Sequence, residues 1–189
     1  MGIPTQPDVS VVIPFRDDED VIGAACTRLL AHLRERGHCP EVLAVDEGSG
    51  DNSKALLAVL ATGESSLRVL HAHAGRGYLV GAREARGRYL LCVEPSSVDA
   101  TIAGQGWALA RMTEPRFDLA VLSGRFALLR RTRGIRVLDR AHGRGVAYHD
   151  RLIKAARREG LGVAEPARPV SSWFSGGPLR FVSSLLSLL

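Results

Sequence analysis

Acidic residues follow two short apolar runs near the start of this sequence, and their placement predicts a shared binding site. The first run, Val9–Phe15, ends in acids at positions 17–19, and the second, Glu41–Asp46, ends in an acid of its own. If the two runs are neighbouring parallel strands, these acids meet at the carboxyl edge of a sheet, where open α/β sheets bind their ligands. Carboxylates at such an edge accept hydrogen bonds from a base or a ribose.

The segment that follows Asp46 has the composition of a tight connection. Gly48 lets the backbone turn sharply, and Ser49, Asp51 and Ser53 favour turns and helix caps. Alone, this segment fits an ordinary strand–turn–helix connection with capping polar groups. Next to the acids of the first run, it favours a nucleotide site.

A second candidate site is the tripeptide Gly75-Arg76-Gly77, which stands between an apolar run and a helical pattern. A glycine-rich loop that opens a helix offers backbone N–H groups and a positive dipole end to an anion, and Arg76 adds a formal charge. The alternative is a simple turn.

Continuous apolar runs and apolar residues at helical spacing predict the elements that hold these residues. We expect strands at Val9–Phe15, Glu41–Asp46, Leu67–His71 and Arg88–Val93. Between them we expect a helix capped by Asp17 or Asp18 and ended by Gly37, a helix starting at Asn52 or Ser53, and a helix from about Tyr78 to Arg86. Short connections between alternating strands and helices require a parallel sheet with right-handed crossovers.

The rest of the chain is predicted to continue the same single domain, residues 1–189, because no linker divides it. We expect helices at Ala100–Met112 and Tyr148–Glu159, strands at Asp118–Leu122, Phe126–Arg130 and Leu161–Ala164, and an apolar tail over 171–189. The interpretation divides the domain into a nucleotide-binding half, 8–94, and an acceptor-side half, 95–170.

Charge and cysteine usage narrow the classes of function. Residues 123–189 carry twelve Arg and one Lys against four acids, so this part is +9 and the remainder −4. Either the basic part meets an anionic surface, or its arginines only keep the protein in solution. Dispersed arginines with 5% aromatic residues argue against nucleic-acid binding.

The sequence also indicates a cytoplasmic protein with reduced thiols. It has three cysteines without metal-site spacing, no signal peptide and no apolar run of about 20 residues.

The two acidic strand ends resemble the Val-Ile-Pro-x-Tyr-Asn-Glu and Val-Asp-Asp-Gly-Ser-x-Asp motifs of family 2 inverting glycosyltransferases with the GT-A fold. The segment Gly75–Tyr78 is similar to the Gly-Lys-Gly-Tyr segment of the polyprenyl- and dolichyl-phosphate sugar synthases in that family. The resemblance implies a Rossmann-like α/β sandwich, with a mostly parallel sheet between helices. It also implies a nucleoside pocket formed by the following residues: Pro14, Phe15, Arg16, Asp18 and Asp46.

The family carries Asp-x-Asp after the fourth strand, where two carboxylates hold a divalent cation. Here the matching residues are Glu94-Pro95-Ser96, with Asp99 beyond them. Mg²⁺ and Mn²⁺ prefer carboxylate oxygen, so Glu94 is a reasonable ligand and Ser96 a poor one. Either Glu94 binds a cation, or it only ends the strand and a cationic side chain such as Arg76 neutralises the diphosphate.

The segment around His149 and Asp150 resembles the family's acceptor-side motif, in which an acid opens a helix. By that resemblance one of the two is the base that deprotonates an acceptor hydroxyl. The alternative is that Asp150 caps the helix and His149 lies at the surface. The region that helps to bind the acceptor in the lipid-phosphate synthases is shortened here, since Phe126–Arg131 follows the preceding strand at once.

The sequence therefore predicts an inverting glycosyltransferase that uses a UDP- or GDP-sugar donor and a lipid-phosphate or other small acceptor. The apolar tail either contacts an anionic membrane surface, packs on the core or forms a homodimer contact, and membrane contact would place the enzyme at the inner face. The altered metal motif supports a second hypothesis, a catalytically impaired pseudoenzyme that binds nucleotide-sugars or acts as a scaffold.

Overall fold

The computed structural model describes residues 6–122, 126–144 and 146–166 of the 189-residue chain. Its strands are β1 (Val9–Phe15), β2 (Pro40–Asp46), β3 (Leu67–His71), β4 (Tyr89–Val93), β5 (Leu119–Leu122), β6 (Phe126–Arg130) and β7 (Val163–Ala164). Its helices are α1 (Ile22–Glu35), α2 (Ser53–Gly63), α3 (Gly77–Glu84), the 3₁₀ turn η1 (Pro95–Ser97), α4 (Val98–Thr113), α5 (Arg131–Arg140) and α6 (Val146–Arg158).

The strands form one sheet in the order β3-β2-β1-β4-β6-β5-β7. The first four strands are parallel, β6 runs antiparallel between β4 and β5, and β7 is parallel to β5. The predicted α/β class, with a mostly parallel sheet flanked by helices, is confirmed. Strand β1 is central and every one of its residues is buried, which explains why all of them except Ser10 are apolar.

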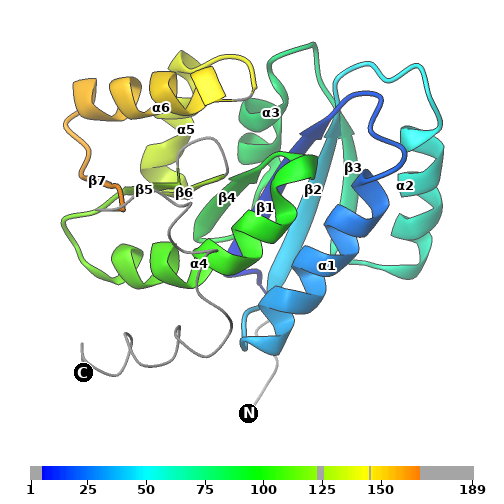
Figure 1. Ribbon diagram of the computed structural model, residues 1–189, viewed down its shortest axis with the longest axis horizontal. Coiled ribbons are helices and arrows are strands. Elements are labelled where there is room, and N and C mark those ends of the chain that lie inside the picture. Colours follow the sequence, from blue (N-terminus) through cyan, green and yellow to red (C-terminus); the bar gives the residue numbers. More distant parts are fainter. Residues whose placement is uncertain (1–5, 123–125, 145, 167–189) are drawn as a thin grey trace.

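Helices cover both faces of the sheet (Figure 1). On one face α1, α2 and α4 pack against Val9, Val11, Ile13 and Phe15 of β1. On the other face α3, α5 and α6 pack around Val12 of the same strand. Alternate residues of β1 thus anchor two separate cores, as strand geometry requires.

Helix α3 lies unusually close to β1 because of a glycine. A Cβ atom at Gly81 would stand 2.3 Å from Cγ1 of Val12, a distance that no side chain accommodates without movement. This close packing fixes the start of α3 beside the carboxyl end of β1, where the candidate site lies.

Several element boundaries differ from the predictions. Helix α1 begins at Ile22 after a turn, and no side chain caps it, so the predicted cap by Asp17 or Asp18 is wrong. Helix α5 was not predicted, because its Arg-rich sequence has only Gly134, Val137 and Leu138 buried. Helix α6 begins at Val146, which places Asp150 inside the helix. The alternative role of Asp150 as a cap is therefore wrong.

Two of the cysteines are buried thiols, as predicted. Cys26 lies in α1 and Cys92 in β4, while Cys39 is partly buried. Burial raises the pKa of Cys26 to about 12 and that of Cys92 still further. The predicted apolar tail, 171–189, lies outside the described residues. Within the part of the chain that is described, no helix has the length and apolar character needed to cross a bilayer.

Candidate nucleotide-sugar site

The loops after β1 and β2 are bonded to each other at the carboxyl edge of the sheet, and residues 16–19 and 47–52 together form one surface, here called the wall. The two strands are parallel neighbours, and Phe15 pairs in register with Asp46. Beyond that pair, reciprocal hydrogen bonds join the loops. The carboxylate of Asp17 accepts from the Gly50 N–H at 2.7 Å, and the Asp17 N–H donates to Ser49 Oγ at 3.2 Å. The predicted meeting of the two acidic strand ends is therefore observed.

Further bonds tie the rest of the wall together. Glu19 N–H donates to Asp51 at 3.0 Å, and the Glu19 carboxylate accepts from the Asn52 N–H at 2.9 Å. Asp17 itself has a φ of 55°, a left-handed conformation that Asp adopts more readily than most residues. Several acids of the motif thus hold the two loops to each other.

Asp46 is buried and largely used by its own turn. Its Oδ1 accepts from the Ser49 N–H and the Ser49 hydroxyl, both at 2.8 Å, and from the Gly48 N–H at 3.2 Å. Burial alone would raise the pKa of Asp46, but these bonds and His71 hold it below its ordinary value. The other carboxylate oxygen, Oδ2, stands 3.5 Å from His71 Nδ1 and takes no part in these bonds of the turn.

The remaining predicted nucleoside residues lie in different surroundings. The Phe15 ring is buried in the core with no exposed surface, so Phe15 offers a ligand only its backbone. The Pro14 side chain packs beneath Gly77, where an added Cβ would stand 2.7 Å from Pro14 Cβ. Arg16 is exposed, and its N–H donates to Asp18 at 2.9 Å. Arg16 and Asp18 therefore present side chains at the edge, whereas Pro14 and Phe15 support it from below.

The Gly75-Arg76-Gly77 loop binds the carboxylate of Glu47, an acid of the protein itself. Gly75 has a φ of 75°, and the Gly77 N–H donates to Glu47 Oε1 at 2.7 Å. Arg76 Nη1 lies 2.7 Å from His142 Nε2. The predicted anion-binding N–H is therefore already used by the acid that follows Asp46.

Arg144, which sequence reasoning missed, lies at the centre of the carboxyl edge. This residue belongs to the connection between α5 and α6. Its Nε donates to Glu94 Oε2 at 3.1 Å, and its Nη atoms lie 3.5 Å from Asp18 Oδ2 and 3.9 Å from Glu47 Oε2. Burial alone would lower the pKa of Arg144, but Glu94 and the other two acids raise it above its ordinary value. One guanidinium thus faces an acid that follows each of the strands β1, β2 and β4.

A sequence signal for Arg144 exists in retrospect. The tripeptide Gly143-Arg144-Gly145 repeats Gly75-Arg76-Gly77. In the structure the two loops touch at Gly143, whose N–H donates to the Gly75 carbonyl at 3.0 Å. The repeated tripeptide therefore marks two loops that meet at one site.

The predicted metal ligands do not form a site for a divalent cation. Glu94 is buried, and its two oxygens meet the Tyr78 hydroxyl at 2.9 Å and the Arg144 Nε. Ser96 is exposed, and Asp99 pairs with Arg28 of α1. Over the described ranges, no group of three or more His, Cys, Asp or Glu side chains could hold a metal ion. The residues at this edge therefore fit a cationic side chain better than Mg²⁺ or Mn²⁺.

His149 and Asp150 face different environments on α6. His149 is 1% exposed, so its predicted alternative, a surface position, is wrong. Its ring meets the Tyr148 ring edge-on at 5.7 Å, and Tyr148 stacks on Tyr78 at 4.7 Å. Asp150 is exposed. The stacked tyrosines connect the start of α6 to Glu94.

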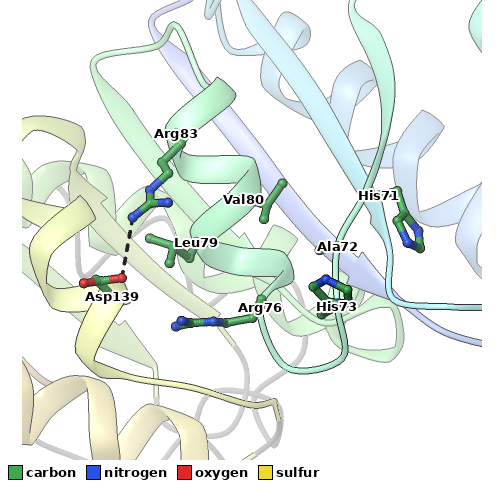
Figure 2. Close-up of a pocket in the computed structure, with 8 residues that line it drawn as sticks. All are labelled: His71, Ala72, His73, Arg76, Leu79, Val80, Arg83 and Asp139. Atoms are coloured by element: carbon green, nitrogen blue, oxygen red, sulfur yellow. Dashed lines mark ion pairs between the residues drawn. The ribbon is translucent and has the colours of Figure 1, made fainter.

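An open pocket of about 280 Å³ adjoins the Arg76 loop on the outer side of α3 (Figure 2). Figure 2 shows Arg83 pointing across it toward Asp139 of α5, and these two side chains form an ion pair at 3.6 Å. The pocket is lined by the following residues: His71, Ala72, His73, Arg76, Leu79, Val80, Arg83 and Asp139. The lining is rich in cationic and imidazole groups, so the pocket suits an anionic or polar group.

Residues 10–94 match the family model described as Glycosyl transferase family 2. The fold is similar to that of a mannosyltransferase from Pyrobaculum calidifontis, solved with GDP-Man and Mn²⁺, at a TM-score of 0.64 and 15% identity. The chain has the GT-A fold of these glycosyltransferases. The resemblance inferred from the two acidic strand ends is thereby confirmed.

A second structure of similar fold is that of glucosyl-3-phosphoglycerate synthase from Mycobacterium tuberculosis, solved with Mn²⁺, UDP and phosphoglyceric acid. It aligns at a TM-score of 0.62 and 17% identity, over 96% of this chain and 78% of the synthase. The alignment with the mannosyltransferase covers 86% of this chain but only 55% of that enzyme. Comparison with curated proteins gives no match.

Proposed function

We propose that this chain transfers a sugar, with inversion, from a UDP- or GDP-linked donor to an acceptor. The observation that carries the proposal is the wall built by the loops after β1 and β2, within the region that matches family 2. Two relatives of the same fold were solved with GDP-Man and with UDP, which supports a nucleoside diphosphate as the donor group.

The proposed donor contacts follow from the placement of each side chain. Asp46 Oδ2 and the exposed Arg16 contact the base and ribose, and Gly48 gives the turn its φ of 92°. Arg76 reaches the phosphates from the start of α3, where the pocket of Figure 2 opens. Electrostatic stabilisation of the departing diphosphate is the main catalytic contribution of such cations.

On the acceptor side, Asp150 is the better candidate base because it is exposed, whereas His149 is buried. A lipid-phosphate acceptor would need no base, since a phosphate oxygen is already nucleophilic. The basic residues after position 123 would then favour an anionic membrane at the cytoplasmic face. The apolar tail, residues 171–189, is the segment proposed to form a homodimer contact.

A pseudoenzyme is the second candidate function, and one observation favours it. Ser96 is exposed and Glu94 is bound to protein groups, so the position of the family's metal motif has lost its usual ligands. Such a protein would bind nucleotide-sugars without turning them over.

Isothermal titration with UDP, GDP, UDP-glucose and GDP-mannose, followed by assay of sugar release, separates these functions. Binding with release of the sugar supports the transferase, and binding without release supports the pseudoenzyme. If none of the four ligands binds, both proposals are wrong. Including vesicles that contain a polyprenyl phosphate tests the proposed acceptor in the same assay.

The substitution Asp46→Asn is the matched test of the nucleoside contact. Asn keeps an oxygen that accepts from Ser49, so the turn is preserved, while the oxygen that faces His71 is replaced. We expect nucleotide affinity to fall about tenfold, the loss of about one good hydrogen bond. Asp99→Asn, which changes an exposed acid paired with Arg28, is the control and should bind like the unmodified chain.

A further inference from the structure

The acids at the carboxyl edge have few free positions for a metal ion. Glu47 Oε1 accepts from the Gly77 N–H at 2.7 Å, Glu94 Oε1 from the Tyr78 hydroxyl at 2.9 Å, and Asp18 Oδ2 from the Arg16 N–H at 2.9 Å. Each acid also faces Arg144, Glu47 and Glu94 through their other oxygen and Asp18 through the same Oδ2. A divalent cation needs about six oxygen ligands, so it would have to displace this guanidinium.

The position of Arg144 is set by the backbone around it. The Gly143 N–H donates to the Gly75 carbonyl at 3.0 Å, and Arg151 donates two hydrogen bonds to the His142 carbonyl, at 3.0 and 2.7 Å. The side chain of Arg144 is 27% exposed. These backbone contacts therefore hold the guanidinium at the carboxyl edge of the sheet and leave one part of it open to solvent.

The hydrogen-bonding capacity of Arg144 is only partly used. Its Nε–H donates to Glu94, but its Nη atoms stand 3.5 and 3.9 Å from Asp18 and Glu47, beyond ordinary hydrogen-bond length. Among the described residues, these Nη groups have ion-pair contacts and no hydrogen bond. A guanidinium in this state can bind two phosphate oxygens through its Nη edge.

We propose that Arg144 is the resident cation of the donor crevice, in the place where a divalent metal would otherwise balance the acids. Arg144 neutralises part of the charge of Asp18, Glu47 and Glu94 and excludes Mg²⁺ and Mn²⁺. Its Nη edge then faces the diphosphate of the donor, a role that depends on the proposed nucleotide-sugar function. Nucleotide affinity is accordingly independent of divalent cations.

The first test measures Mn²⁺ alone, by the loss of its free-ion EPR signal on protein addition. We expect the unmodified chain to leave the signal unchanged at 100 μM Mn²⁺, about the scale of a weak protein site. Arg144→Gln, which frees three acids from their cation, should bind Mn²⁺ at least tenfold more tightly. Arg144→Lys keeps the charge and should exclude Mn²⁺ like the unmodified chain.

The second test titrates UDP and GDP in EDTA and again in Mn²⁺. For the unmodified chain we expect the dissociation constant to change less than about twofold between the two conditions, which is near the precision of such a measurement. In EDTA, Arg144→Gln should lose at least about tenfold in affinity, the scale of one charge-assisted bond, and Mn²⁺ should restore much of that loss.

The control is Arg133→Gln, because Arg133 also pairs with a buried acid, Asp118, at 3.0 Å, but on α5 near the amino end of β5. It should behave like the unmodified chain in both tests. Tenfold tighter nucleotide binding by the unmodified chain in Mn²⁺, or Mn²⁺ binding by that chain alone, would overturn the proposal. If no nucleotide binds in any condition, the proposed function fails, while the Mn²⁺ measurement still decides whether Arg144 is the resident cation.

Discussion

Buried carboxylates occur in two regions of this protein, and their partners differ in kind. Glu41, in the amino-terminal part of β2, accepts at one oxygen from the Ser10 hydroxyl at 2.7 Å and the Arg86 N–H at 2.6 Å. Its other oxygen lies 3.6 Å from Arg68. Neutral donors and one cation thus satisfy a single acid.

The carboxyl edge has the opposite balance. There Arg144 is shared by Asp18, Glu47 and Glu94, so three acids face one cation. The partners of Glu41 balance its charge locally, as in a structural network. At the carboxyl edge the negative charge of three acids exceeds the single positive charge of Arg144, as is common at binding sites. Substitutions in the first region should alter stability, and those in the second should alter binding.

The largest effect is expected at Glu41. Glu41→Ala leaves Ser10, Arg86 and Arg68 without their shared acceptor in a buried position. We expect the free energy of unfolding, measured by urea denaturation, to fall by about 3 kcal/mol. A loss below about 1 kcal/mol would contradict the structural role of this acid, and nucleotide affinity of the folded fraction should not change.

A smaller effect is expected at the tyrosines beneath the crevice, which form a matched pair. Tyr78→Phe removes the hydroxyl that donates to Glu94, and it should cost about 1.5 kcal/mol in the same denaturation experiment. The Tyr148 hydroxyl is buried and has no hydrogen-bond partner among the described residues. Tyr148→Phe should therefore change stability by less than about 0.5 kcal/mol, or increase it. Equal losses in the two variants would show that ring packing, not the bond to Glu94, determines both.

The smallest effect is expected at a third carboxylate, Glu64, which lies near the surface. Arg34 donates to both of its oxygens, at 2.7 and 2.8 Å, and lowers the pKa of Glu64 from 4.5 to about 2. A lowered carboxyl pKa stabilises the fold above the unfolded value, and this contribution disappears as the pH falls from about 4.5 to about 2.

Glu64→Gln should therefore cost less than about 1 kcal/mol at pH 7, because exposed pairs contribute little. Denaturation midpoints for the variant and the unmodified chain should converge as the pH is lowered through this range. A difference between them that persists at pH 2 would mean that packing of the side chain, and not its charge, accounts for the effect.

The sequence predicted the first four strands because β1 to β4 are parallel strands with apolar runs that end at polar turns, although only β1, β2 and β4 are largely buried. It also predicted that the acids after β1 and β2 meet, since neighbouring parallel strands end at one edge. The sequence could not predict whether β6 runs parallel or antiparallel to β4, because a strand that is buried along its length has the same apolar pattern in both orientations. Arg144 was missed because the acids that it contacts lie 50 or more residues away, and the repeated Gly-Arg-Gly tripeptide does not by itself show which residues face it.

The reciprocal bonds between Asp17 and the Ser49–Gly50 segment have a consequence for ligand association. Two separate loops would each lose conformational entropy on closing around a nucleoside, and that loss would weaken the complex. Here the loss occurs when the chain folds, because the loops are already fastened to each other. Association at this surface should then be limited by encounter and by side-chain contacts, and the wall should have the same shape before and after the ligand arrives.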